Sequence, residues 1–495
     1  MLSRINRQTH KVSLSLMLLF LGMHIGITQQ AVTAQTPASP TSTTKSVCPA
    51  QLGALIDTTI NRPLFSRARW GILVKNLVST QTLYNRDGEK YFIPASNTKL
   101  LTTATALKQL GADFRIRTSV YQDADGSLRV VGRGDPSLKN AQLTELAKQL
   151  RQQGITQVTN LIADDSYFQG DIVNPSWQWE DVQADYGAPV NSLILNENAA
   201  VLTLLPQTVG NPLQIKWADP TEAYQWRVEN NSVTVQKDEP GLVEIKRDLK
   251  GAVLYLQGQL PVNAAPEVTA IAVFNPTQNF LRKFRQSLAA TGISVQQTSI
   301  VNGGNNEREV AAIESPPLSD LLTETNVNSN NLFAEALLRT LAVNQQLTKN
   351  QNTADVGLKV MQETLTQFGV KPNSYSVFDG SGLSRKNLIS PEALVQLLEA
   401  ITASPEAKVF RATLPVAGVS GSLKNRFRNT SAEGIVQAKT GTLRGVVALS
   451  GYIDSPQYEP LVFSIIVNQS DQPASTIRQA VDEIVVLLTQ LRRNC

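Results

Sequence analysis

Histidine is almost absent from this chain of 495 residues, which has only His10 and His24. Both lie within the first 34 residues, so a protein without that segment would contain no imidazole. This absence excludes a Ser-His-Asp triad and HExxH zinc chemistry. No cluster of residues has the spacing of metal ligands, and we expect no metal site. Proton transfer must therefore use Lys, Asp, Glu, Tyr or the backbone.

The N-terminal segment has the pattern of a secretory signal. Arg4, Arg7 and Lys11 precede the apolar stretch "VSLSLMLLFLGMHIGI", and small residues including Ala34 follow. The stretch is short for a membrane span, and the pattern predicts a signal peptide over residues 1–34. An uncleaved membrane anchor is the alternative. With cleavage, we expect a periplasmic or otherwise extracytoplasmic protein with no stable membrane insertion.

Charged residues are few, at 17%, while apolar residues make up 42%, which is typical of a folded globular protein. Losing the three basic residues of the signal lowers the formal charge from +4 to +1. A chain this close to neutral gives no reason to expect nucleic-acid binding. Its length predicts two or three domains.

Only two cysteines are present, Cys48 and Cys495, near the two ends of the mature chain. An exported protein can form a disulfide between them, because the termini of a domain often lie close together. Two free thiols are the alternative.

The order of the predicted elements indicates one interrupted domain. Residues 35–48 are rich in Pro, Ser and Thr and predict a linker. Strands near both ends, with helices between them, predict an α/β domain built from residues 49–114 and 266–495. Residues 115–265 form an inserted, strand-rich accessory module, for which we expect two subdomains.

The stretch "FIPASNTKLLTTATALKQLG" places Ser96 and Lys99 at the start of a predicted helix. Residues three apart share one helix face, with Cβ atoms about 5–6 Å apart. The positive field of the helix N-terminus lowers the pKa of a nearby ammonium, and a desolvated lysine can accept a hydroxyl proton. The alternative is a helix cap followed by a solvated lysine, and Ser42 and Lys45 show the same spacing by chance.

Two further stretches of sequence support the interpretation of Ser96 and Lys99 as a nucleophile and its base. "NVNSNNLFAEALLR" holds Ser329 and Asn331 ahead of a helix, and "VQAKTGTLRG" holds Lys439, Thr440 and Gly441 on a strand. Taken singly, they would be an N-cap and a strand end. In the order SxxK, SxN, KTG, they resemble the motif set of the penicillin-recognising serine hydrolases.

The resemblance is closest to one branch of that superfamily. "GRGDPSL", "WQWEDVQADYGAPVNSLILNEN", "DGSGLSRKN" and "AKTGTLRGVVALSGY" resemble the D-alanyl-D-alanine carboxypeptidase/endopeptidases, the low-molecular-mass class C penicillin-binding proteins. The likeness runs from about Ala50 to the C-terminus. It implies an α/β (α+β) serine β-lactamase/D,D-peptidase-like domain, with an antiparallel sheet flanked by helices. It also implies action on peptidoglycan peptides, β-lactams as covalent inhibitors and no cofactor.

The resemblance assigns catalytic roles to three residues. Ser96 would attack the carbonyl between two D-alanines and become acylated, and Lys99 would take its proton. Ser329 would relay that proton to the leaving amine. Water would then hydrolyse the acyl-enzyme.

Five residues would bind substrate by the same resemblance. Asn331 would bond the substrate amide and help to hold Lys99. Lys439 and Thr440 would bind the terminal carboxylate. Gly441 would leave room for the substrate beside the strand, and the N–H of Thr442 would form an oxyanion hole with that of Ser96.

Several marked residues keep two interpretations. Asp379 and Ser381 either border the site or form a Gly-rich turn, and Asp135 is interpreted as turn-forming. Trp177 and Trp179 either pack in the core or contact glycan, and Arg444 could contact a substrate carboxylate. The rival functions are a β-lactamase on the same scaffold and a non-catalytic receptor for wall peptides or penicillin. The sequence does not separate carboxypeptidase from endopeptidase activity, and it predicts no oligomeric state.

Overall fold

The computed structural model describes residues 46–495 except 249, 302, 304–307, 343–350 and 494. The predicted signal peptide, and all but the last three residues of the predicted linker, lie outside the described residues. The end of that linker belongs to the folded region, because Val47 is buried and forms a β-bridge with Leu491. Among the described residues, no helix combines the length and apolar character needed to cross a membrane.

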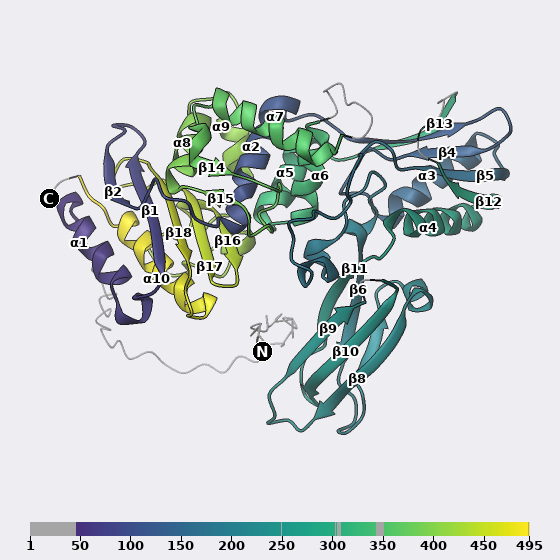
Figure 1. Cartoon of the computed structure of the whole chain (residues 1–495), viewed down its shortest axis with the longest axis horizontal. Coiled ribbons are helices and arrows are strands. Elements are labelled where there is room, and N and C mark those ends of the chain that lie inside the picture. The colour runs from purple at the N-terminus through teal and green to yellow at the C-terminus, as the bar shows by residue number, and fades with distance from the viewer. Residues whose placement is uncertain (1–45, 249, 302, 304–307, 343–350, 494) are drawn as a thin grey trace, which may run out of the picture. The chain divides into compact units, whose positions relative to one another are not determined.

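A five-stranded antiparallel sheet joins the two ends of the chain, in the order β16-β17-β18-β1-β2 (Figure 1). The first strand pairs along its whole length with the last one. β16 lies at one edge of the sheet. The strands predicted near both ends of the chain are thus confirmed. Their bounds are β1 (Arg69–Asn76), β2 (Thr82–Arg86), β16 (Val436–Leu443), β17 (Val446–Ile453) and β18 (Leu461–Asn468).

Both faces of this sheet are covered, which explains why β17 and β18 are apolar at nearly every position. Side chains alternate between the two faces of a strand. Ile465 and Val467 accordingly pack with α1 (Pro49–Ile60) and α10 (Ala474–Thr489), whereas Val462 and Ile466 pack with α8 (Pro391–Thr402). The sheet therefore separates two hydrophobic cores.

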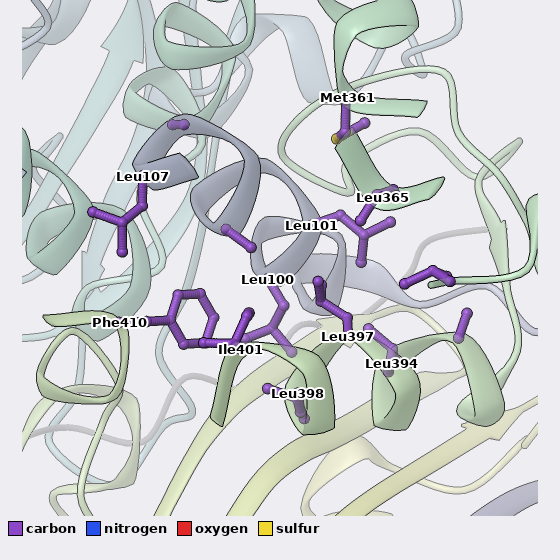
Figure 2. Packing of buried hydrophobic residues seen from close by; sticks show 14 of the residues in the cluster. Leu100, Leu101, Leu107, Met361, Leu365, Leu394, Leu397, Leu398, Ile401 and Phe410 are labelled. Atoms are coloured by element: carbon purple, nitrogen blue, oxygen red, sulfur yellow. The ribbon is translucent and has the colours of Figure 1, made fainter. Parts of the chain in front are cut away.

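Helix α2 (Thr98–Leu110) lies in the middle of the larger core, and its first ten residues are all buried. Figure 2 shows its leucines packed among side chains of α8 and of two further helices, α7 (Thr353–Gln367) and α9 (Ala407–Ala412). Helices α5 (Leu318–Val327) and α6 (Asn331–Thr340) also contact it. Two of its buried threonines, Thr103 and Thr105, donate to backbone carbonyls of the preceding turn, and Thr102 Oγ1 donates to Gly380 O at 2.6 Å. A helix enclosed on all sides holds the residues at its start in fixed positions.

The inserted segment contributes a second five-stranded sheet, in the order β12-β5-β4-β3-β13. β3 and β4 form an antiparallel hairpin around Asp125 and Gly126. Two helices, α3 (Asn140–Gln152) and α4 (Pro276–Ala290), pack in one core with this sheet. The strands are β3 (Arg117–Gln122), β4 (Leu128–Val131), β5 (Gln157–Asp164), β12 (Ser294–Ile300) and β13 (Arg308–Glu314).

This sheet corrects the predicted end of the insertion at residue 265. The domain predicted over 266–495 would contain α4, β12 and β13, but β12 pairs with β5 and β13 pairs with β3. By sheet pairing, the insertion extends from β3 to β13. The prediction was wrong because pairing between strands distant in sequence, such as Arg117 with Glu314, leaves no trace in the local hydrophobic pattern.

Two three-stranded sheets occupy the strand-rich middle of the insertion, in the orders β8-β10-β9 and β11-β6-β7. They share a hydrophobic core that includes Trp217 and Trp226. A short pair, β14 (Tyr375–Ser376) and β15 (Leu388–Ile389), brackets the loop over 377–387. The other strands are β6 (Ala199–Leu205), β7 (Gln214–Trp217), β8 (Arg227–Val235), β9 (Leu242–Arg247), β10 (Val253–Pro261) and β11 (Glu267–Ala272).

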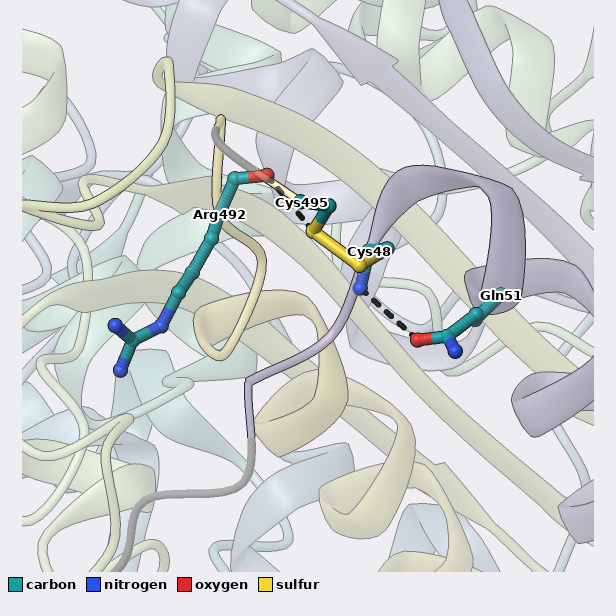
Figure 3. The surroundings of a disulfide bond; sticks show 4 residues. All are labelled: Cys48, Gln51, Arg492 and Cys495. Carbon is teal, nitrogen blue, oxygen red and sulfur yellow. Dashed lines mark hydrogen bonds between the residues drawn. A yellow bond between two sulfur atoms is a disulfide. The ribbon is translucent and has the colours of Figure 1, made fainter.

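The two cysteines form a disulfide, which decides between the alternatives that the sequence left open (Figure 3). The Cα atoms of Cys48 and Cys495 are 5.7 Å apart. Cys48 immediately precedes α1, and its backbone N–H donates to Gln51 Oε1 at 3.3 Å. The bond therefore ties the start of α1 to the last residue of the chain.

Candidate active site

Ser96 and Lys99 lie together at the start of α2. Ser96 is in a 3₁₀ turn, Ala95–Asn97, that leads into the helix. The side chain of Lys99 is fully buried, and its Nζ lies 3.0 Å from Ser96 Oγ. The same amine donates to Asn331 Oδ1 at 2.6 Å and to the carbonyl oxygen of Ser381 at 2.7 Å. The alternative of a solvated lysine is therefore excluded.

The surroundings of Lys99 favour a neutral amine. Burial lowers the pKa of Lys99 to about 7, although the carboxylates of Asp379 and Glu335 act in the opposite direction. A neutral amine has two N–H donors and one lone pair. Two of its three neighbours are oxygens that only accept, while the Ser96 hydroxyl can also donate. The neutral form can thus satisfy all three contacts if its lone pair accepts the hydroxyl proton of Ser96, which lies within hydrogen-bond distance.

The cap of α6 leaves the two motif residues beside it available to the site. Asn330, between Ser329 and Asn331, is the N-cap, and its Oδ1 accepts from Phe333 N at 3.2 Å. Ser329 adopts a left-handed backbone conformation with φ of 59°. The Asn331 amide donates to Tyr186 O at 2.8 Å, which orients its oxygen toward Lys99. The N-cap alternative is thus correct for Asn330 and wrong for Ser329 and Asn331.

Lys439, of the KTG motif, contacts Ser329, of the SxN motif. Its Nζ donates to Ser329 Oγ at 2.8 Å from β16, the edge strand of the central sheet. The side chain is fully buried, and burial, followed by the charge of Lys99, lowers the pKa of Lys439 well below its ordinary value. Thr440 Oγ1 donates to Ser422 Oγ at 2.7 Å, a partner that the sequence analysis did not mark. Thr442 is exposed on the same strand.

Gly441 has a packing role that the sequence did not indicate. A Cβ atom at this position would lie 2.7 Å from Pro94 O and 3.2 Å from Ala95 Cβ. The glycine thus lets β16 approach the turn that carries Ser96. Ala95 itself has a positive φ of 49°, so this turn is held in a conformation that non-glycine residues seldom adopt.

Glu335 and Asp379 organise the loop behind Lys99, and the sequence analysis missed the first of them. Glu335 Oε1 accepts from the backbone N–H of Gly380 and of Ser381, both at 2.8 Å. Asp379 accepts from Gly382 N at 2.8 Å and from Ser384 N at 2.6 Å. Both interpretations of the "DGSGLS" stretch hold, because it is a tight turn and its Ser381 carbonyl contacts Lys99.

The inserted segment borders the same site. Besides the Tyr186 carbonyl on Asn331, Trp177 Nε1 donates to Asp379 Oδ2 at 2.9 Å and Asn174 Nδ2 donates to Phe378 O at 2.7 Å. A cavity of about 540 Å³ adjoins Ser329 and Asn331 and is otherwise lined mostly by the insertion. The insertion thus forms part of the wall of the site.

The remaining marked residues divide between structure and surface. Trp177 is buried, as core packing predicts, whereas Trp179 is 58% exposed. Asp135 forms the predicted turn by accepting from Ser137 N and Ser137 Oγ. Arg444 is exposed just beyond β16. The described residues contain no group of three or more His, Cys, Asp or Glu side chains that could hold a metal ion.

The sheet flanked by helices, with a serine and buried lysine at the start of its central helix, defines the class of penicillin-recognising serine hydrolases. The sequence model of the D-Ala-D-Ala carboxypeptidase 3 (S13) family matches residues 52–490. The chain belongs to this family. The predicted family, fold class and serine-type D-Ala-D-Ala carboxypeptidase activity are thereby confirmed.

Known relatives match over most of their length. A D-alanyl-D-alanine carboxypeptidase of Actinomadura sp. (strain R39) is 33% identical over 88% of this chain and 84% of its own. A penicillin-sensitive carboxypeptidase A of Dictyostelium discoideum is 30% identical over 85% of this chain and 87% of its own. The crystal structure of penicillin binding protein 4 (dacB) from Haemophilus influenzae shares the fold, with a TM-score of 0.76 and 24% identity, over 88% of this chain and 98% of that one.

Proposed function

We propose that the chain removes the terminal D-alanine from peptidoglycan stem peptides through an acyl-enzyme on Ser96. The observation that carries this proposal is the 3.0 Å contact between Ser96 Oγ and the buried Nζ of Lys99. With a pKa of about 7, this amine can take a proton from the hydroxyl at neutral pH. The chain offers a nucleophile and its base without an imidazole.

Acylation then follows in two steps. Ser96 Oγ attacks the carbonyl carbon of the penultimate D-alanine, and its proton passes to Lys99 Nζ. The backbone N–H groups of Ser96 and Thr442 hold the resulting oxyanion, each donor contributing about 3–4 kcal/mol in comparable enzymes. The C–N bond breaks as Ser329 relays the proton to the leaving nitrogen, and free D-alanine departs. A water molecule hydrolyses the ester on Ser96 in the second half of the reaction.

Substrate recognition depends on the edge strand and on Asn331. The terminal carboxylate binds Lys439 and Thr440, which supply a positive charge and a hydroxyl. Burial disfavours the charged form of Lys439 in the free enzyme. A carboxylate that enters the pocket replaces the lost solvation, so substrate binding draws a proton onto this lysine. Asn331 bonds the substrate amide while its oxygen keeps its contact with Lys99.

β-Lactams would acylate the same serine and leave slowly. One relative, from D. discoideum, is named as penicillin-sensitive. We further propose an exported, periplasmic or otherwise extracytoplasmic enzyme. Its support is the signal-like pattern of residues 1–34 and the Cys48–Cys495 disulfide, a bond typical of oxidising compartments.

Covalent labelling tests the proposal directly. The protein is incubated with penicillin and digested, and its peptides are mapped by mass spectrometry. We expect a single adduct on Ser96, no adduct in Ser96→Ala, and release of D-alanine from a pentapeptide ending in two D-alanines by the unmodified protein only. An adduct on another residue, or an active Ser96→Ala protein, would refute it. Peptide binding without D-alanine release would favour the receptor, and rapid turnover of a chromogenic β-lactam the β-lactamase.

Endopeptidase activity requires the same chemistry on a different leaving group. The bond cleaved is again a D-alanyl amide, but the nitrogen belongs to a cross-linked neighbouring peptide. Digestion of intact sacculi separates the two activities. Loss of cross-linked dimers would show the endopeptidase, and shortening of monomer stems would show the carboxypeptidase.

A further inference from the structure

Helix α6 carries a buried ion pair one turn beyond the motif residue Asn331. Glu335 and Arg339 are four residues apart, with side chains 0% and 2% exposed, and Arg339 Nη1 lies 3.2 Å from Glu335 Oε2. Buried ion pairs stabilise proteins little, because desolvating two charges offsets their attraction, and apolar pairs of similar size are often equally stable. Stability alone therefore does not account for this pair.

The other oxygen of Glu335 holds the peptide that contacts Lys99. Oε1 accepts from Gly380 N and from Ser381 N, and the carbonyl of Ser381 accepts from Lys99 Nζ at 2.7 Å. The approach is close, since a Cβ at Gly380 would lie 3.0 Å from Ala334 O. Two residues one turn apart on α6 thus act on the same amine. Asn331 contacts it directly, and Glu335 acts through the peptide of Ser381.

We propose that Glu335 is a positioning residue for Lys99, which fixes the direction of its amine through the Ser381 carbonyl and adjusts its charge. The proposal rests on the role of Lys99 as the base for Ser96. Arg339 takes the second oxygen of Glu335 and in turn donates to Asp171 O at 3.2 Å, so it keeps the carboxylate in place.

Four charged groups surround the Lys99 amine or act on it. The carboxylates of Asp379 and Glu335 raise the pKa of Lys99 against the effect of burial. The charge of Lys99 disfavours the charged form of Lys439, and Arg339 offsets part of the charge of Glu335. Burial raises the pKa of Glu335 itself, while Arg339 and the N–H of Ser381 oppose that effect. Removal of the Glu335 charge should therefore move the protonation of Lys99 to lower pH.

Two double variants separate the effect of Glu335 on the direction of the Lys99 amine from its effect on the charge of that amine. Glu335→Gln with Arg339→Gln keeps an acceptor oxygen for Gly380 and Ser381 and removes both charges. Glu335→Leu with Arg339→Leu also removes the acceptor, while it leaves no unpaired buried charge. The matched control is Glu399→Gln, which breaks an ion pair with Lys75 elsewhere in the fold. The readout is the second-order rate of acylation by a fluorescent penicillin as a function of pH, with melting temperatures to verify folding.

We expect the double glutamine variant to keep its plateau rate of acylation within about tenfold of the unmodified protein. The acidic limb of its pH–rate profile, where the rate falls as Lys99 becomes protonated, should shift to lower pH. The leucine pair should lose roughly 10- to 100-fold in plateau rate, a loss of the size seen when a hydrogen-bonding partner that orients a functional group is removed. The control should change neither quantity. A folded leucine pair with an unchanged rate would overturn the proposal. If the leucine pair does not fold, an unmoved acidic limb in the glutamine pair overturns it. An unmodified protein that is not acylated at Ser96 would instead refute the proposed function.

Discussion

The amine of Lys439 donates a hydrogen bond to Ser329 Oγ at 2.8 Å, which joins the last sequence motif to the second one. The contact places a lysine of the edge strand β16 next to a serine that precedes α6. Once a substrate carboxylate has drawn a proton onto this amine, the resulting ammonium can both polarise the Ser329 hydroxyl and bind the carboxylate. Both tasks depend on its charge.

The first prediction concerns this charge. Lys439→Met should raise KM for a peptide with a free C-terminal carboxylate by roughly 10- to 100-fold, because hydrogen bonds to charged groups contribute about 1.5–3 kcal/mol. The unmodified enzyme should discriminate strongly against the C-terminally amidated peptide, and the variant should not. Steady-state kinetics with both peptides measure this, with the exposed Lys408→Met as control. Retained discrimination in Lys439→Met would contradict the assignment.

The second prediction is a pH profile. Burial lowers the pKa of Lys99 to about 7, so the amine is protonated and inactive as a base below that pH and neutral above it. The acylation rate should therefore rise with pH and level off above about 7, with a roughly tenfold loss one pH unit below the midpoint. Lys99→Arg stays charged at all accessible pH values and should lack this rise. A midpoint near 10, the ordinary value for lysine, would show that the amine is not desolvated in solution.

The third prediction separates two neighbouring asparagines. Asn330→Ala removes the N-cap of α6 and should lower the free energy of unfolding by about 1 kcal/mol with little change in acylation. Asn331→Ala removes an acceptor of the Lys99 amine and should slow acylation by roughly 10- to 100-fold. Urea denaturation and penicillin acylation measured on both variants check the pair. The reverse assignment of effects would mean that the cap residue was misidentified.

The fourth prediction concerns the disulfide. The double variant Cys48→Ser with Cys495→Ser should lower the free energy of unfolding by about 2–4 kcal/mol. Acylation at room temperature should stay unchanged, because α1 and α10 pack on the face of the sheet opposite to the core of α2. Denaturation of the variant, compared with the unmodified protein in its oxidised form, measures the first effect. A large loss of activity in the folded variant would contradict this separation of the two faces.

The catalytic motifs could be predicted from the sequence because each is short and local. Ser96 and Lys99 are three residues apart. Ser329 stands just before a helix, and Lys439 lies within a strand. Glu335 was missed because it occurs in the apolar run "NLFAEALLR", where a single acid has the appearance of a solvated helix charge. A signal was present in the i, i+4 spacing of Asn331, Glu335 and Arg339, which places all three on one helix face.

The insertion shows what local patterns do not contain. The presence of many strands and a few helices between about residues 115 and 315 was largely predictable from the local sequence pattern. The pairing of β13 with β3 and of β12 with β5 was not, because it depends on contacts between distant segments. The carbonyl of Tyr186 likewise has no signature in the sequence, since any residue could supply it, yet it orients Asn331.

The pairing of the first strand with the last has a consequence for biosynthesis. A ribosome that stops before Val436 releases a polypeptide with Ser96, Lys99 and Ser329 but without Lys439 and three of the five sheet strands. Such a fragment lacks β16, β17 and β18 of the central sheet, and it lacks the amine that donates to Ser329 Oγ. We therefore expect a product that ends before Val436 to be inactive, because it lacks both Lys439 and the strands that pair with β1.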